Sequence, residues 1–254
     1  MSRVCTETGL ALLSEPVTGF RIAKSSYGPT NPVPHSQKPE SSRDWSRFDT
    51  VGSTLYLAGD QRTAYAESLS WARMTPGHRK SLQKVADFAG ISIEQVSAEV
   101  RDDWERSGKM TPGWIPVDWR AGRILYTLHI DQPGEWIDLT AAESVAAINR
   151  GLGEELNDLY GETFLTLSTL TGDNREITTL IAAWLREQVL DSGAYPLGVK
   201  FHSKHGGGIG WAYWMRRFDD GLGPEKVRVL AATEIEPTDA DYCSVLKMFD
   251  IESR

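Results

Sequence analysis

Residues 46–69 read SRFDTVGSTLYLAGDQRTAYAESL and carry the clearest structural signal in the chain. Thr54–Ala58 is a short apolar run with an aromatic residue, which predicts a β-strand. Residues 61–73 follow at once and predict a helix that packs Ala64 and Leu69 against a sheet. The stretch therefore predicts a strand joined to a helix by a tight connection, with Tyr56 on the strand and Glu67 in the helix.

On both sides of this stretch, short segments rich in aromatic and β-branched residues alternate with helical patterns. Strands are predicted at residues 20–23, 123–130, 136–139, 197–202, 211–214 and 226–233. A capping-box pattern at Ser92 predicts a helix that runs to about Trp104. Residues 174–189 predict an amphipathic helix, with one apolar face formed by Ile177, Leu180, Ile181, Trp184, Leu185 and Val189. This mixture predicts an α+β fold with a mixed central β-sheet flanked by helices.

The composition is that of one ordinary globular domain over residues 1–254, with 40% hydrophobic residues. A net charge of −8 argues against direct binding of nucleic acid or of an anionic membrane. Cys5 and Cys243 stand at opposite ends of the chain and suggest neither a disulfide framework nor a thiolate metal site. We see no signal peptide or apolar run long enough to span a membrane. We expect a cytoplasmic protein.

Two segments stand apart from this pattern. Residues 25–46 contain four prolines and predict a long loop, which is either a mobile flap over a ligand or a variable surface loop. Residues 76–119 form an expected helical insertion. The tryptophans Trp104, Trp114 and Trp119 in it predict either core packing or a partner-binding patch.

A third segment, GVKFHSKHGGG at residues 198–208, ends a strand in a serine followed by glycines. Together with GFRI at residues 19–22 and the Arg47–Glu67 block, it resembles the RES domain, named for its arginine, glutamate and serine. The likeness covers roughly residues 18–75 and 120–235. It implies a fold similar to that of ADP-ribosyltransferases, and characterised members are bacterial toxins that destroy NAD.

The resemblance assigns a role to individual positions. Catalytic roles fall to Glu67, Arg47 and Ser203, and cofactor-binding roles to Arg21, Tyr56, Ile22 and His202. Ile22 stands where many family members carry an aromatic residue. NAD is implied as the substrate, and no metal is expected.

The residues themselves leave alternatives open. Strand alternation places the Arg21 side chain opposite Phe20 and Ile22, either on a solvated face or gripping a pyrophosphate as a guanidinium fork does. Arg47 could take the same role or anchor its turn by binding carbonyls. Glu67 is either exposed on its helix or held in a cleft, where its charge could stabilise an oxocarbenium-like transition state.

The remaining candidate residues also have a structural and a functional interpretation. Tyr56 is either a core residue or a partner of the nicotinamide or its ribose. Ser203 has no base at triad spacing and suits a positioning hydrogen bond. His202 and His205 form an H-x-x-H pair without further zinc ligands. The glycine run at 206–208 predicts a flexible connection between strands and is not a phosphate-binding fingerprint.

The leading hypothesis is an NAD-consuming toxin that cleaves the nicotinamide–ribose bond as a glycohydrolase or phosphorylase, within a toxin–antitoxin system. The resemblance implies an Xre-like antitoxin partner, and a homo-oligomer is compatible with the sequence. One rival is an ADP-ribosyltransferase that modifies a protein. Another is a non-catalytic nucleotide-binding module.

Overall fold

The computed structural model describes residues 2–36, 42–107, 111–205 and 207–253. The strands are β1 (Ser2–Val4), β2 (Ala11–Leu13), β3 (Val17–Lys24), β4 (Thr54–Ala58), β5 (Trp114–Ile115), β6 (Arg123–Ile130), β7 (Trp136–Asp138), β8 (Gly198–His202), β9 (Ile209–Trp214), β10 (Val227–Glu234) and β11 (Glu252–Ser253). The α-helices are α1 (Gln61–Leu69), α2 (Pro76–Ala89), α3 (Ile93–Arg106), α4 (Val117–Ala121), α5 (Ala142–Tyr160), α6 (Leu167–Thr171), α7 (Arg175–Arg186), α8 (Arg216–Asp219) and α9 (Ala240–Phe249). Two 3-10 turns, η1 (Ser42–Asp44) and η2 (Ser70–Ala72), complete the list.

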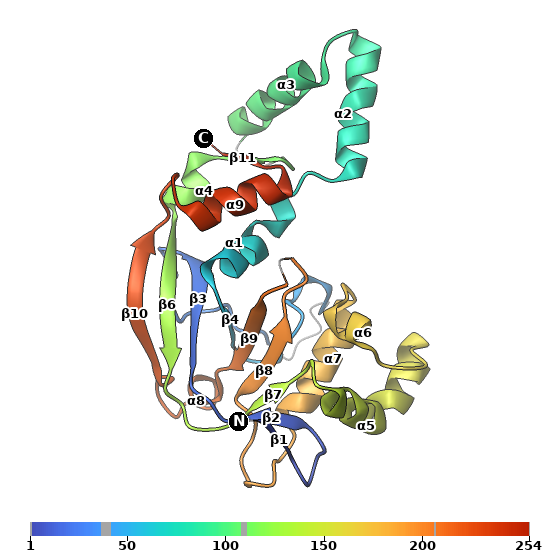
Figure 1. Ribbon diagram of the computed structural model, residues 1–254, viewed down its shortest axis with the longest axis vertical. Helices are drawn as coiled ribbons and strands as arrows, with labels where there is room; N and C mark the ends of the chain where they lie inside the picture. Colours follow the sequence, from blue (N-terminus) through green and yellow to red (C-terminus); the bar gives the residue numbers. More distant parts are fainter. Residues whose placement is uncertain (1, 37–41, 108–110, 206, 254) are drawn as a thin grey trace.

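A nine-stranded sheet in the order β1-β2-β7-β8-β9-β4-β3-β6-β10 forms the centre of the molecule. The sheet is mixed, because β7 and β8 are parallel while the other neighbours are antiparallel. Helices α5, α6 and α7 lie beside β7, β8 and β9, whereas α1, α4 and α9 lie across the other end of the sheet (Figure 1). The predicted α+β class, with a mixed central sheet flanked by helices, is confirmed.

Three apolar clusters hold these layers together. One joins α5 and α7 to β7, β8 and β9 through residues such as Ile148, Ile181 and Val199. A second joins α1 and α9, with Tyr65 and Tyr242 fully buried. The third covers β4, β6 and β9. Burial of this apolar surface is the main source of stability, and it fixes where α1 and β8 stand relative to each other.

The segment 76–119 is largely helical, as predicted. Helices α2 and α3 form a hairpin that extends from the main body (Figure 1). Ser92 and Gln95 make the expected capping box at the start of α3. Trp114 and Trp119 are buried while Trp104 is 37% exposed, so the three tryptophans form no common patch. Whether this hairpin is an insertion relative to a family stays a prediction.

The sheet is weakly joined between β3 and β4, both fully described, which pair at Phe20 and Ala58 alone. Gly19 permits this close approach, because a Cβ there would lie 2.9 Å from the Ala58 carbonyl oxygen. Next to this pair, Arg21 Nη1 donates a 3.4 Å hydrogen bond to the Tyr56 carbonyl. The gap in the ladder leaves room for a cavity.

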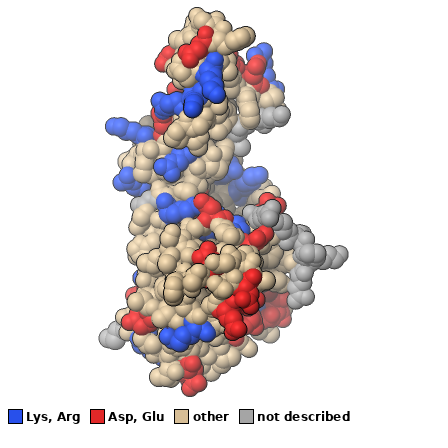
Figure 2. Space-filling model, turned by 90° about the vertical axis from the view of Figure 1, so that its right-hand side faces the viewer, with Lys and Arg blue, Asp and Glu red and all other residues tan. Residues whose placement is uncertain are grey.

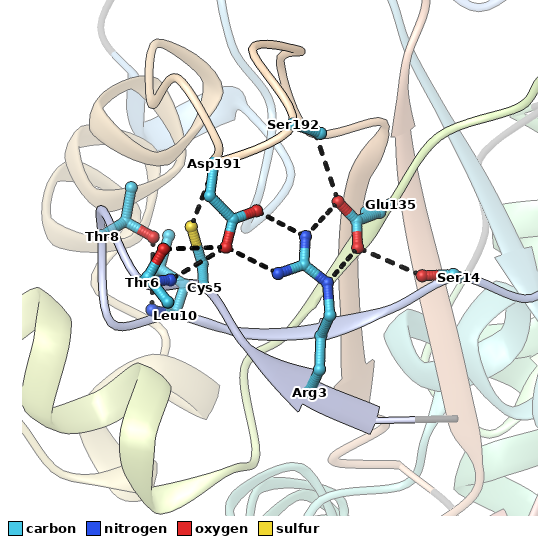
Figure 3. Close-up of polar contacts among 9 residues, drawn as sticks. All are labelled: Arg3, Cys5, Thr6, Thr8, Leu10, Ser14, Glu135, Asp191 and Ser192. Atoms are coloured by element: carbon cyan, nitrogen blue, oxygen red, sulfur yellow. Dashed lines mark hydrogen bonds and ion pairs between the residues drawn. The ribbon is translucent and has the colours of Figure 1, made fainter.

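An arginine clamp fastens β1 to the rest of the sheet (Figure 3). Arg3 donates four hydrogen bonds of 2.6–2.8 Å, two to Glu135 just before β7 and two to Asp191 after α7. Glu135 also accepts from Ser14, and Asp191 from the Thr6 amide. The Arg3 hydrogen bonds hold the pKa of Asp191 and of Glu135 below their usual range. All three charged groups of the clamp are thus well paired.

Charge is unevenly spread over the surface. On the face in Figure 2, Lys and Arg are frequent toward the end that carries α2 and α3, and a cluster of Asp and Glu lies toward the opposite end. Among the described residues, no helix combines the length and apolar character needed to cross a membrane.

Candidate functional site

A cavity of about 320 Å³ opens beside the β3–β4 gap. It is bounded by β3, β4, α1, the turn before β4, the start of α7, and the β8–β9 hairpin. Its lining includes six of the seven predicted site residues: Arg21, Ile22, Arg47, Tyr56, Glu67 and Ser203. Segments that are far apart in the sequence therefore place a glutamate, a serine and two arginines around one space.

Glu67 is placed by the start of α1. Asp60 caps this helix by accepting from the Thr63 amide at 2.7 Å and from the Thr63 hydroxyl at 2.9 Å. Ala64 and Leu69 pack into the core, and Glu67 faces the cavity with its side chain 35% exposed. Of the two interpretations of Glu67, exposed on its helix or held in a cleft with partners, the structure shows the second.

Ser203 reaches Glu67 because the β8–β9 hairpin closes tightly. The Ser203 amide donates to the Gly208 carbonyl at 2.7 Å. Gly208 lies against α1, since a Cβ there would stand 1.9 Å from the Thr63 hydroxyl. Ser203 Oγ donates to Glu67 Oε1 at 2.6 Å and accepts from the His205 amide at 3.1 Å. The serine thus orients the carboxylate, and Gly206 of the glycine run lies outside the described residues.

Arg47 stands in a rigid turn. The Phe48 amide donates to the Tyr56 hydroxyl at 2.9 Å, and the Phe48 carbonyl accepts from Trp214 Nε1 at 3.2 Å. The Ser46 amide donates to Asp49 at 2.7 Å. These bonds stabilise the turn without the Arg47 guanidinium, which among the described residues bonds no carbonyl. The alternative in which Arg47 anchors its own turn is therefore not what the structure shows.

The Arg47 guanidinium is buried and only partly satisfied. Its side chain is 6% exposed, its Nη2 lies 3.4 Å from Glu67 Oε1, and the buried Nη1 has no partner in the described part of the chain. The Phe201 ring lies 5.1 Å from it. Burial lowers the pKa of Arg47, and the nearby Glu67 carboxylate opposes that shift. Unused donors on a buried cation favour an anionic ligand.

Arg21 shares this character. It is not on a solvated face: its Nε is buried and unpaired among the described residues, and burial lowers its pKa to about 10. It stays charged at neutral pH and adds a second positive group to the cavity wall.

The other predicted residues differ in placement. Tyr56 lies in the middle of β4, and its hydroxyl is engaged by the Phe48 amide. Burial raises the pKa of that hydroxyl well above its usual value. Ile22 contributes an aliphatic wall. His202 is exposed on β8 and does not line the cavity, because strand alternation sends Phe201 and Ser203 inward.

Two neighbours of this site, Arg175 and Trp45, were not predicted from the sequence, and His205 was considered only as a metal ligand. Arg175 opens α7 and lines the cavity, Trp45 lines it from the loop after η1, and His205 follows Ser203. Burial lowers the pKa of His205, while Glu67 acts in the opposite direction. Within the described ranges, no three His, Cys, Asp or Glu side chains gather as a metal site would require.

Comparison with known proteins adds little. No family model matches the chain. No curated protein matches it either. A chain in the crystal structure of the M. tuberculosis MbcT–MbcA toxin–antitoxin complex is similar at 14% identity and a TM-score of 0.40, over 94% of this chain and 91% of that chain. A likeness this distant says nothing about activity.

Proposed function

We propose that the chain consumes NAD by breaking the bond between nicotinamide and ribose. The observation that carries the proposal is the Ser203–Glu67–Arg47 cluster at the wall of a partly apolar cavity, beside the unpaired guanidinium nitrogens of Arg47 and Arg21. Six of the seven residues assigned by the resemblance to the RES domain line this cavity, and His202 does not. The proposal also includes the toxin role and an Xre-like antitoxin, both of which come from that resemblance.

Each group has a chemical task in this proposal. The pyrophosphate takes the unused N–H groups of Arg21 and Arg47, because a guanidinium binds phosphate oxygens in a fork. The cavity volume of about 320 Å³ lies at the small end for ligand sites. It suits the nicotinamide nucleoside half, with the rest of the dinucleotide directed toward the surface.

The Glu67 carboxylate faces the ribose in this arrangement. As the C1′–N bond breaks, its electron pair leaves with nicotinamide and positive charge develops on the ribose ring. An ionised carboxylate held by Ser203 stabilises that charge more than it stabilises the ground state. Water or phosphate then adds its oxygen to C1′ and loses a proton to solvent.

The test is to incubate the purified chain with NAD labelled separately in the nicotinamide and adenine halves. We expect free nicotinamide together with ADP-ribose, or with its phosphorylated form in phosphate buffer. Label retained on protein would instead identify an ADP-ribosyltransferase. Binding without any product would identify a non-catalytic module, and either result overturns the proposal. Expression in bacteria without a partner should also lower cellular NAD and stop growth.

A further inference from the structure

Trp45 forms part of the cavity wall in a way that the proposed reaction does not explain. It follows η1 and lines the cavity together with Ile22 and Arg47. Its indole Nε1 is buried and has no hydrogen-bond partner among the described residues. Trp71 and Trp214, in contrast, each donate their Nε1–H to a backbone carbonyl. The Trp45 ring is therefore not held in place by its own N–H group.

Stacking holds the ring instead. The His35 imidazole lies on Trp45 with ring centroids 4.3 Å apart and an interplanar angle of 22°. His35 Nε2 lies 2.9 Å from Asp49 Oδ2, and the backbone of His35 forms two hydrogen bonds with Gly52, of 2.8 and 2.9 Å. His35 is thus a fixed backing for an aromatic ring on the wall of the cavity. A preorganised flat surface of this kind reduces the entropy lost when a ligand stacks on it.

Other side chains of the lining offer less free aromatic surface than Trp45. Ile22 follows Arg21 and offers only an aliphatic side chain. Tyr56 has its hydroxyl engaged, and the Phe201 ring already contacts Phe48 and the Arg47 guanidinium. Trp45 is the largest of the aromatic side chains that line the cavity, and the His35 ring backs it.

We propose that Trp45, backed by His35, is the platform on which a planar heteroaromatic base of the nucleotide stacks. The inference rests on the proposed function, because it assumes that the cavity binds a dinucleotide. It adds a binding residue for the base to the arginines that bind phosphate. Base stacking on an aromatic side chain changes affinity by roughly 5- to 150-fold.

The experiment measures binding to Trp45→Leu and Trp45→Phe by calorimetry, in a Glu67→Gln background in which turnover should be about 10²- to 10³-fold slower. Nicotinamide mononucleotide and ADP-ribose serve as separate probes, so the half-ligand that loses affinity identifies the base. We expect Trp45→Leu to weaken one probe by about 5- to 150-fold and Trp45→Phe to restore most of the loss. Trp104→Leu, on α3 and away from the cavity, is the matched control and should change neither probe.

His35 is tested as the positioning residue. His35→Ala should weaken the same probe as Trp45→Leu, and His35→Phe, which keeps a ring behind Trp45, should restore it. A purely structural role would instead lower affinity for both probes and lower the thermal midpoint in both variants. If folded Trp45→Leu binds both probes as tightly as its background protein, no base stacks on Trp45. This result would overturn the inference even if the parent chain consumes NAD. Failure of the parent chain to bind NAD is a different outcome and overturns the proposed function first.

Discussion

Two arginine–carboxylate clusters in this molecule differ in how completely they are paired. The clamp at Arg3 has two carboxylates, four hydrogen bonds of 2.6–2.8 Å and further donors from Ser14 and Thr6. The cavity cluster at Arg47 has one carboxylate at 3.4 Å and a buried nitrogen without a described partner. The fully paired cluster is near the surface, with Arg3 40% exposed, and the partly paired one is inside, with Arg47 6% exposed.

Physical chemistry favours the reverse arrangement if both clusters served stability alone. An unpaired buried charge is costly, whereas an exposed arginine has water as an alternative partner. The comparison indicates that the clamp joins β1 to the sheet. The cavity cluster instead leaves guanidinium N–H groups of Arg47 unpaired and able to bind a ligand. Substitutions at the clamp should therefore change stability, and substitutions at the cavity cluster should change NAD binding and turnover. Four predictions test this difference.

The largest expected effect is on catalysis. Glu67→Gln keeps the acceptor for Ser203 but removes the charge, so we expect NAD turnover to fall by about 10²- to 10³-fold. Initial rates of nicotinamide release measure this change. Glu135→Gln at the clamp is the matched control and should turn over NAD like the parent. Full activity in a folded Glu67→Gln protein would remove Glu67 from the mechanism.

The second effect is on ligand affinity and runs against stability. Arg47→Met should weaken NAD binding by about 10- to 100-fold, and Arg47→Lys should restore little, because an ammonium lacks the guanidinium fork. The free energy of unfolding should equal that of the parent or exceed it by up to ~2 kcal/mol, because an apolar group replaces a buried charge whose one ion pair is long, 3.4 Å, and joins it to a Glu67 side chain that is 35% exposed to water. Calorimetry and urea unfolding measure the two quantities.

Arg21→Met, measured in parallel, tells which arginine contributes more to phosphate binding. Unchanged NAD affinity in both variants means that the phosphate contact lies elsewhere.

The third effect is smaller. Ser203→Ala removes one hydrogen bond to Glu67, worth about 0.5–1.5 kcal/mol, so NAD turnover should fall only about 2- to 13-fold. Ser192→Ala, which removes a 3.5 Å bond to the clamp carboxylate Glu135, is the control and should leave turnover unchanged. A loss in Ser203→Ala as large as that in Glu67→Gln would give the serine a direct role in the reaction.

The smallest effect concerns pH and the clamp. Arg3 lowers the pKa of Asp191 and Glu135, so their contribution to stability is present above about pH 4 and is lost as pH falls through the lowered folded-state values. Arg3→Met should reduce stability at neutral pH with no change in turnover. Its unfolding midpoint should depend less on pH below about 4 than that of the parent. Parallel curves for the two proteins would contradict this account.

Several elements could be predicted from local sequence because their signals are local. The strand at Thr54–Ala58, the Ser92 capping box and the apolar face of α7 depend on neighbouring residues, and all three are observed. Val189 is the exception on that face: it lies beyond the end of α7 and is 51% exposed. The sequence also predicted six of the residues that line the cavity, through their resemblance to a family pattern.

Helix α5 shows why local signals can fail. It has no side-chain cap at Ala141 and contains Gly151 and Gly153, which weaken an isolated helix. Gly151 is there because α7 packs against it: a Cβ would stand 2.2 Å from the Trp184 ring. The helix is therefore stabilised by a contact with another segment. Likewise β1 and β2, of three residues each, depend on pairing with β7 and on the Arg3 clamp.

Residue type and short-range spacing were enough to predict the fold class and the β4–α1 unit, whereas the main cavity residues were predicted through the resemblance to a family pattern. Only the tertiary structure decided the strand order, the single pairing between β3 and β4, and the exposure of His202 on the outer side of β8. It also brought Trp45 and Arg175 to the cavity. These features arise from packing between distant segments, which no local pattern records.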